Sequence, residues 1–256
     1  GDCPTMTTTI SLAELNATSS LLQRVDRKYL LDLTDAEGFI EEISATSRVL
    51  EINGSTWFDY RSCYFDTPDL FRYRQAGHKR RRRFKVRTRE YLSSGSNWLE
   101  LKTRGVRGTT IKDRIPHPAR TLMPSDQVWI AATLAHRGVD TAPIPLLQPT
   151  LVTSYMRRTL QTLPAQNHGP TRVTIDRRLA VELTNNAPTG ALFADLSHKV
   201  IVETKGFPRP SGIDHLLYRM GYRPRSISKY GIGTALLRID QPAFRWTRLM
   251  NTDFAA

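Results

Sequence analysis

The residues of this chain that could do chemistry are concentrated in one cationic stretch. Residues 72–107 contain 13 lysines and arginines but only two acids, and the whole chain has a formal net charge of +13. Segment 81–92 is predicted to be a β-strand, and side chains alternate between the two faces of a strand. One face would then carry only cations, which repel one another unless a dense anion lies opposite. These cations are Arg81, Arg83, Lys85, Arg87 and Arg89.

Carboxylates within the charged pattern predict a divalent metal. Asp26, Glu100, Asp176 and Glu203 each lie two positions from a basic residue on a predicted strand. A carboxylate repels phosphate, so in a phosphate site it more often binds Mg²⁺ or Mn²⁺, and the metal bridges phosphate oxygens. Phosphoryl transfer then depends on positioning and charge neutralisation, and it requires no covalent protein nucleophile.

The composition is that of a soluble globular protein with an anionic partner. The 256 residues are 39% hydrophobic and 24% charged, and the pI is near 10.1, which indicates nucleic acid, a phosphate-rich small molecule or an anionic membrane surface. Two cysteines give no disulfide framework and no metal-ligand spacing, so we expect a cytoplasmic protein. No apolar run approaches the roughly 20 residues that span a bilayer.

The elements that must position these residues follow from their periodicity. Helices are predicted over 11–22, 34–47, 125–136 and 211–220, where capping residues precede apolar runs. Strands are predicted over 24–31, 59–67, 81–92, 98–104, 109–115, 151–163, 172–183 and 199–206. Beyond residue 240 no strong pattern is present. We expect residues 1–10 to be a disordered or vector-derived N-terminus, 11–240 a single domain and 241–256 a C-terminal tail.

Several predicted strands carry charge on one face and apolar residues on the other. A closed antiparallel barrel accommodates this pattern if charged residues line the interior and helices pack against the apolar outside. We therefore predict an α+β fold built on a β-tunnel wide enough for a polyphosphate chain. A nucleic-acid surface should instead show its cations on one contiguous face with aromatic residues available for stacking, so no nucleic acid is expected.

An ordered set of short motifs resembles the VTC domain, the polyphosphate polymerase branch of the triphosphate tunnel metalloenzymes. The resemblance runs from about residue 24 to residue 235. The first strand has Arg24-x-Asp26-x-Lys28 where the tunnel family usually has Glu-x-Glu-x-Lys, a departure that resembles the VTC branch. The other motifs are Tyr64-Phe65-Asp66-Thr67, Lys85-Val86-Arg87-Thr88-Arg89-x-Tyr91, Glu100-Leu101-Lys102, Ser154-Tyr155-x-Arg157, Arg172-Val173-Thr174-Ile175-Asp176, Glu203-x-Lys205 and Ser228-Lys229-Tyr230.

The resemblance implies a tunnel that binds ATP, inorganic polyphosphate and a divalent metal. It implies transfer of the γ-phosphoryl group of ATP to a growing polyphosphate chain. Glu203 would be the principal metal ligand, and we add Glu100 as a second candidate. Further contacts to the bound phosphates are expected from Lys85, Arg24 and Lys205. The phosphate ligands implied by the motifs are Lys28, Arg87, Arg89, Lys102, Arg157, Arg172 and Lys229.

Alternatives remain open at this level. The same tunnel could hydrolyse tripolyphosphate or a nucleoside triphosphate with water as nucleophile, or a basic β-domain could bind polyphosphate or nucleic acid without turnover. Segment 79–82 could be a tunnel mouth or a surface patch. Tyr64, Phe65 and Tyr91 are expected to be packing residues. The acceptor, the preferred metal, translocation of product and the oligomeric state are not encoded in any motif.

Overall fold

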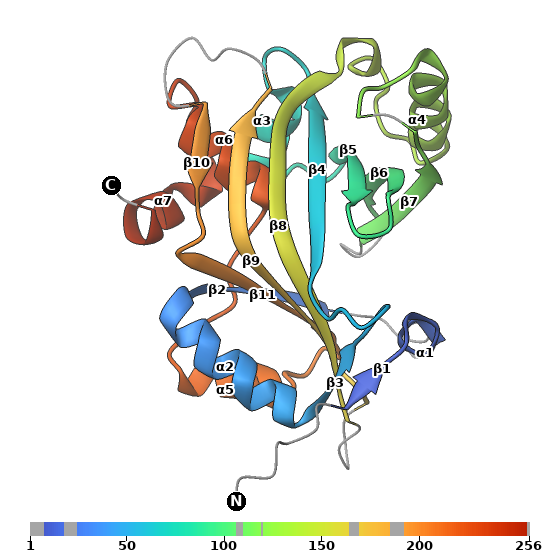
Figure 1. The fold of residues 1–256 in the computed structure, drawn as a ribbon. Coiled ribbons are helices and arrows are strands. Elements are labelled where there is room, and N and C mark those ends of the chain that lie inside the picture. Colours follow the sequence, from blue (N-terminus) through green and yellow to red (C-terminus); the bar gives the residue numbers. More distant parts are fainter. Residues whose placement is uncertain are drawn as a thin grey trace, which may run out of the picture. The chain divides into compact units, whose positions relative to one another are not determined.

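The computed structural model describes residues 8–17, 25–105, 110–118, 120–163, 169–184 and 192–254 (Figure 1). The chain divides into two compact units. Unit 1 comprises residues 1–59, 155–179 and 195–227, and unit 2 comprises 60–154, 180–194 and 228–256. The long strands β8 (Gln148–Thr162) and β9 (Arg172–Leu183) contribute to both units.

The sheet of unit 1 is built around strand β11 (Lys199–Gly206). This strand pairs antiparallel with β2 (Val25–Asp32) on one side and with β9 on the other, and β8 follows β9. Strand β3 (Ser47–Leu50) pairs antiparallel with β8, and the short strand β1 (Thr9–Ile10) pairs parallel with β3. The helices of this unit are α1 (Leu12–Ala17), α2 (Leu33–Ala45) and α5 (Gly212–Arg219).

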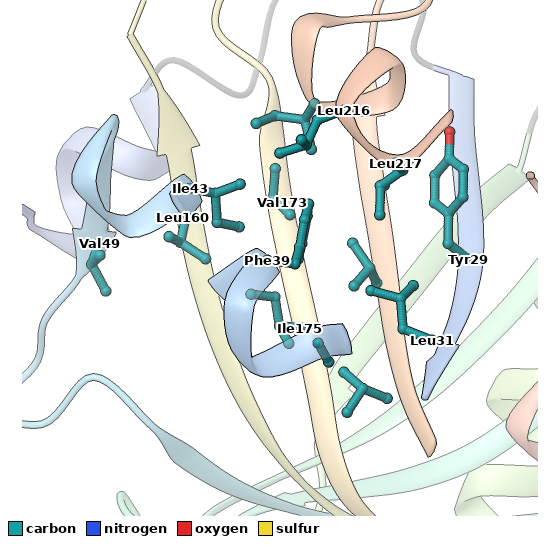
Figure 2. Packing of buried hydrophobic residues seen from close by; sticks show 14 residues of the cluster. Tyr29, Leu31, Phe39, Ile43, Val49, Leu160, Val173, Ile175, Leu216 and Leu217 are labelled. Atoms are coloured by element: carbon teal, nitrogen blue, oxygen red, sulfur yellow. The ribbon is translucent and has the colours of Figure 1, made fainter. Parts of the chain in front are cut away.

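One face of the unit 1 sheet is apolar because alternate strand residues pack against α2 and α5. Figure 2 shows this core, which includes Phe39 of α2, Leu217 of α5 and the strand residues Val173 and Ile175. Tyr29 also belongs to the core, and its hydroxyl donates a 2.6 Å hydrogen bond to Asp214. Asp214 also forms the predicted capping box at the start of α5. The charged residues that alternate with these apolar ones therefore lie on the opposite face.

Unit 2 has an antiparallel meander. Its strands lie in the order β8, β4 (Phe58–Asp66), β5 (Phe84–Tyr91), β6 (Ser96–Arg104) and β7 (Thr110–Pro116). From β4 to β7, neighbouring strands are also consecutive in the sequence. Phe65, Val86 and Leu99 pack on Ile130 and Leu134 of α4 (Pro124–His136). The remaining helices are α3 (Phe71–Gly77), η2 (Ile144–Leu146), α6 (Lys229–Leu237), η3 (Phe244–Trp246) and α7 (Thr247–Asp253).

The structure confirms the α+β class and changes several boundaries. The hydrogen-bonded order of the described strands runs from β2 to β7 without closing into a ring. Strand β5 begins at Phe84, so the prediction that Arg81 and Arg83 share its cationic face is wrong: both precede the strand, in the turn region after α3. Of the helix predicted over 11–22, the described part is α1, and residues 18–24 lie outside the described ranges. Helix α7 occupies a segment in which no pattern was expected.

Within the described ranges, no helix combines the length and the apolarity that crossing a bilayer requires.

Candidate anion-binding faces

The charged face of unit 1 is set by the register of three strands. Lys28 of β2 lies opposite Glu203 of β11, and Lys205 lies between Asp26 of β2 and Arg172 of β9. All five side chains therefore lie on the face that α2 and α5 do not cover. The register thus places cations from three strands, β2, β9 and β11, next to one another on this face.

Glu203 is the central acid of this face. It is 9% exposed, and its Oε1 lies 3.1 Å from Lys28 Nζ and 3.6 Å from Lys205 Nζ. Burial raises the pKa of Glu203, but Lys205, Lys28 and Arg157 outweigh it and hold that pKa well below its ordinary value. The carboxylate is therefore ionised at neutral pH.

Arg157 and Arg172 have partners that fix their orientation. Arg157 makes a bidentate pair with Asp176, with Nε–Oδ1 and Nη2–Oδ2 distances of 2.6 and 2.7 Å, and Asp176 is 2% exposed. Arg172 donates from Nη2 to the carbonyl of Leu15 at 2.8 Å. These contacts fix the direction in which each guanidinium points.

The charged face of unit 2 is organised around Glu100, which is fully buried. Its Oε2 accepts from Nε and Nη2 of Arg87 at 2.8 and 2.6 Å, and Arg89 Nε lies 3.7 Å from the same oxygen. Lys112 Nζ lies 2.9 Å from Oε1. Burial raises the pKa of Glu100, and the three cations outweigh it and lower that pKa far below the ordinary value.

Lysines extend this face along the meander. Lys85, Lys102 and Lys112 lie opposite one another on β5, β6 and β7, and Lys85 Nζ donates to Ser228 Oγ at 2.8 Å. Ser228 caps helix α6, on which Lys229 is the first residue. The Lys229 side chain therefore emerges from the same helix end that Lys85 contacts.

A buried cluster fixes that helix end. The hydroxyl of Tyr230 donates to Asp66 at 2.6 Å, and Asp66 also accepts from the backbone N–H groups of Arg72 and Tyr73 at 2.8 Å. The rings of Tyr64 and Tyr230 are stacked, with centroids 5.2 Å apart. Desolvation raises the pKa values of Asp66 and Tyr230. Strand β4, helix α3 and helix α6 are thus held by one carboxylate.

The predicted site residues therefore divide between two units. Arg24 lies outside the described residues. Sequence reasoning missed Lys112 and Arg114, although their alternation on a predicted strand was the available signal. Exposed residues 79–82 precede β5. Unit 1 holds Lys28, Arg157, Arg172, Glu203 and Lys205 on its charged face, and unit 2 holds Lys85, Arg87, Arg89, Glu100, Lys102 and Lys229.

The donor chemistry fits a divalent metal at Glu203 better than at Glu100. Among the described residues, no three His, Cys, Asp or Glu side chains form a group able to hold a metal by themselves. Mg²⁺ commonly takes one or two carboxylates and completes its shell with water and substrate phosphates. At Glu203 both lysines approach Oε1, whereas at Glu100 cations contact both oxygens.

Comparisons with known proteins identify a family. The family model for the VTC domain matches residues 23–238. No curated protein matches the chain in sequence. A candidate adenylate cyclase from Vibrio parahaemolyticus is 12% identical and aligns over 82% of this chain and 96% of its own, with a TM-score of 0.44. A candidate adenylyl cyclase from Hippeastrum, described as having a dominant triphosphatase activity, is 12% identical over 86% and 99%, with a TM-score of 0.43.

Proposed function

The chain belongs to the VTC domain family, and we propose that it is a metal-dependent polyphosphate polymerase. The reaction would transfer the γ-phosphoryl group of ATP to the end of a growing inorganic polyphosphate chain. The observation that carries this proposal concerns the part of the sheet in each unit. One of its faces is apolar and packs against helices, and the other carries ordered cations with few acids. Such cations need a multiply charged ligand to offset their repulsion.

In this proposal the cations bind and orient phosphate oxygens. Lys28, Lys205 and Arg172 would do so in unit 1, and Lys85 and Lys102 in unit 2, with Arg87, Arg89, Arg157 and Lys229 as additional ligands. Because Glu100 already neutralises part of the charge on Arg87 and Arg89, it would keep these guanidiniums in place when no phosphate is bound. Their fixed positions would then stabilise charge that develops on the transferred group without reorganisation.

The chemistry requires no protein nucleophile. A terminal phosphate oxygen of the acceptor chain would form the new P–O bond while the bond from the γ-phosphorus to the β,γ-bridging oxygen breaks and ADP leaves. Glu203 would hold Mg²⁺ or Mn²⁺ beside the lysines of its face. When bound, the metal supplies positive charge to the phosphate oxygens.

We further propose that the strands close into the charged β-tunnel expected from the sequence, within a single domain over residues 11–240. The support is the family match, which includes residues of both units. A cytoplasmic location, where ATP and reduced thiols are available, agrees with the free, buried thiol of Cys63.

The deciding experiment incubates purified protein with ATP and Mn²⁺ and resolves the products by chain length. Long chains support the polymerase, and free phosphate without chains would replace it with a hydrolase. Glu203→Gln should abolish turnover, whereas Glu42→Gln, on the exposed surface of α2, should not. If neither product forms and Glu203→Gln leaves triphosphate affinity intact, a binding module is the better description.

A further inference from the structure

Two arginines lie beside Trp57 on the side of the unit 1 sheet that the proposed reaction does not use. Arg158 follows Arg157, and Arg177 follows Asp176, so each points away from the charged face because neighbouring strand residues alternate. Arg177 Cζ lies 3.8 Å from the centroid of the Trp57 ring, and Arg158 Cζ lies 5.8 Å from it. Trp57 itself packs against the hydrophobic core of unit 1. One rigid ring therefore holds two guanidiniums together.

Within the described residues, this pair has no ion-pair partner. Among the described residues, no carboxylate lies within ion-pair distance of Arg158 or Arg177. The Nε atoms of both are buried, and neither has a hydrogen-bond partner in the described chain. Burial lowers the pKa of both guanidiniums. The neighbouring charge of Arg177 lowers the pKa of Arg158 further. The charge of Arg178 likewise lowers the pKa of Arg177, and the attraction of Glu37 raises that pKa by less than Arg178 lowers it.

Two half-buried like charges without an anion are unfavourable unless something relieves them. The position of both guanidiniums over the Trp57 ring offsets part of this cost through cation–π attraction. A planar guanidinium presents N–H groups in a fork that matches two oxygens of a phosphate. A phosphate group also carries up to two negative charges at neutral pH, enough to offset both arginines.

We propose that Arg158 and Arg177, aligned by Trp57, form a second phosphate-binding site, separate from the charged face that carries Glu203. Its ligand is a phosphate group, either free orthophosphate or a unit of a polyphosphate chain. The site binds and does not react, because no acid or nucleophile of the described residues contacts either guanidinium. It would therefore exist whether or not the charged face polymerises phosphate.

The test measures binding through the tryptophan in the site. The full chain, in phosphate-free buffer, is titrated with sodium orthophosphate and separately with tripolyphosphate while tryptophan emission is recorded. Sodium chloride at matched ionic strength controls for screening. We expect a saturable component of the emission change that is absent in Trp57→Phe, whereas any signal from Trp98, which lies beside Arg114, should remain. Arg158→Gln and Arg177→Gln should each weaken the response by about tenfold or more, since each removes charge-assisted hydrogen bonds to the anion.

A matched control is Arg223→Gln. Arg223 also lies over an aromatic ring, 4.9 Å from the centroid of Tyr218, but it donates to the carbonyls of Tyr218 and Tyr222. Among the described residues, no second guanidinium lies over the Tyr218 ring. This variant should bind like the parent. Saturation by orthophosphate identifies the free anion as sufficient, and a response to tripolyphosphate alone identifies the chain as the ligand.

Stability gives an independent readout. Because each glutamine variant relieves repulsion between the two arginines, it should melt no earlier than the parent without phosphate. It should also show a smaller phosphate-induced rise in melting temperature than the parent, because only the charged faces would still bind the anion. The proposal is overturned if both glutamine variants bind orthophosphate with the parent's affinity, if chloride reproduces the emission change, or if the whole emission change survives in Trp57→Phe.

Discussion

Glu100→Gln is the substitution that most directly tests the charge balance of unit 2. The parent carboxylate is fully buried, and it contacts Arg87, Arg89 and Lys112 within 4 Å. Glutamine has nearly the same shape, so packing is preserved while the negative charge is lost. The side chains of Arg87 and Arg89 are only 11% and 9% exposed. Water therefore has little access to these two guanidiniums and cannot compensate for the loss of the carboxylate.

The expected loss of folding stability follows from the burial of these ion pairs. Removing one partner of a buried ion pair costs about 3–5 kcal/mol, because the other charge stays buried and uncompensated. For a chain of this size, such a loss corresponds to a fall in melting temperature of about 6–20 °C. A phosphate ligand should stabilise the variant more than the parent, because the anion would take the place of the carboxylate beside the two arginines.

The difference in folding stability between the parent and Glu100→Gln should depend on pH, and the direction of this dependence follows from the pKa of Glu100. The cations lower the pKa of Glu100 from its ordinary value of 4.5, so the ionised carboxylate stabilises the folded state above that value. This contribution is lost as the pH falls below 4.5 toward the folded-state pKa. The stability gap between the parent and Glu100→Gln should therefore be widest at neutral pH and narrow in acid.

The assay is urea unfolding followed by circular dichroism at several pH values, without phosphate. Glu90→Gln is the matched control, since Glu90 lies on the neighbouring strand and pairs with the largely exposed Arg120. An exposed pair contributes about 0–1 kcal/mol. If Glu100→Gln loses no more than Glu90→Gln, the buried carboxylate is not the counter-charge of Arg87 and Arg89, and the reasoning fails.

Three further substitutions probe other parts of the molecule. Lys102→Ala should weaken tripolyphosphate binding about tenfold or more in calorimetry; unchanged affinity would remove β6 from the proposed phosphate site. Tyr230→Phe should lower the free energy of unfolding by about 1–3 kcal/mol, because buried Asp66 loses a hydrogen-bond donor; a neutral effect would contradict the role of the cluster. Gly231→Ala would drive a Cβ into the ring of Trp246, so the emission of Trp246 should shift to the red; unaltered emission would show that the helix end can yield.

The sequence by itself predicted the longer strands and which of their residues share a face, but not the short strands β1 and β3. Alternation placed Lys85, Arg87 and Arg89 on one side of β5 and Val86 on the other, and the register of the sheet agrees. The capping box of Ser211 and Asp214 fixed the start of α5. These features depend on a residue and its near neighbours, so local periodicity and capping chemistry are sufficient to predict them.

The ends of strands were harder to predict from the sequence, because no residue within a run of arginines marks where a strand begins. Arg81 and Arg83 fit the alternation but lie before the strand, which starts where Phe84 enters the core. Helix α7 was missed because its short sequence has little periodicity; the burial of Leu249 nevertheless anchors it to the protein.

Only the tertiary structure decided which charges meet. Nothing local indicates that Glu100 would have three cationic partners or that Arg157 would be bonded to Asp176. Nor does it indicate that Arg158 and Arg177 would share Trp57 with no carboxylate of the described residues at ion-pair distance. Each of these contacts joins strands or loops whose register is set by the whole sheet. The sequence thus determined the chemical character of the charged faces, and the fold decided which cations are already neutralised and which still need an anion.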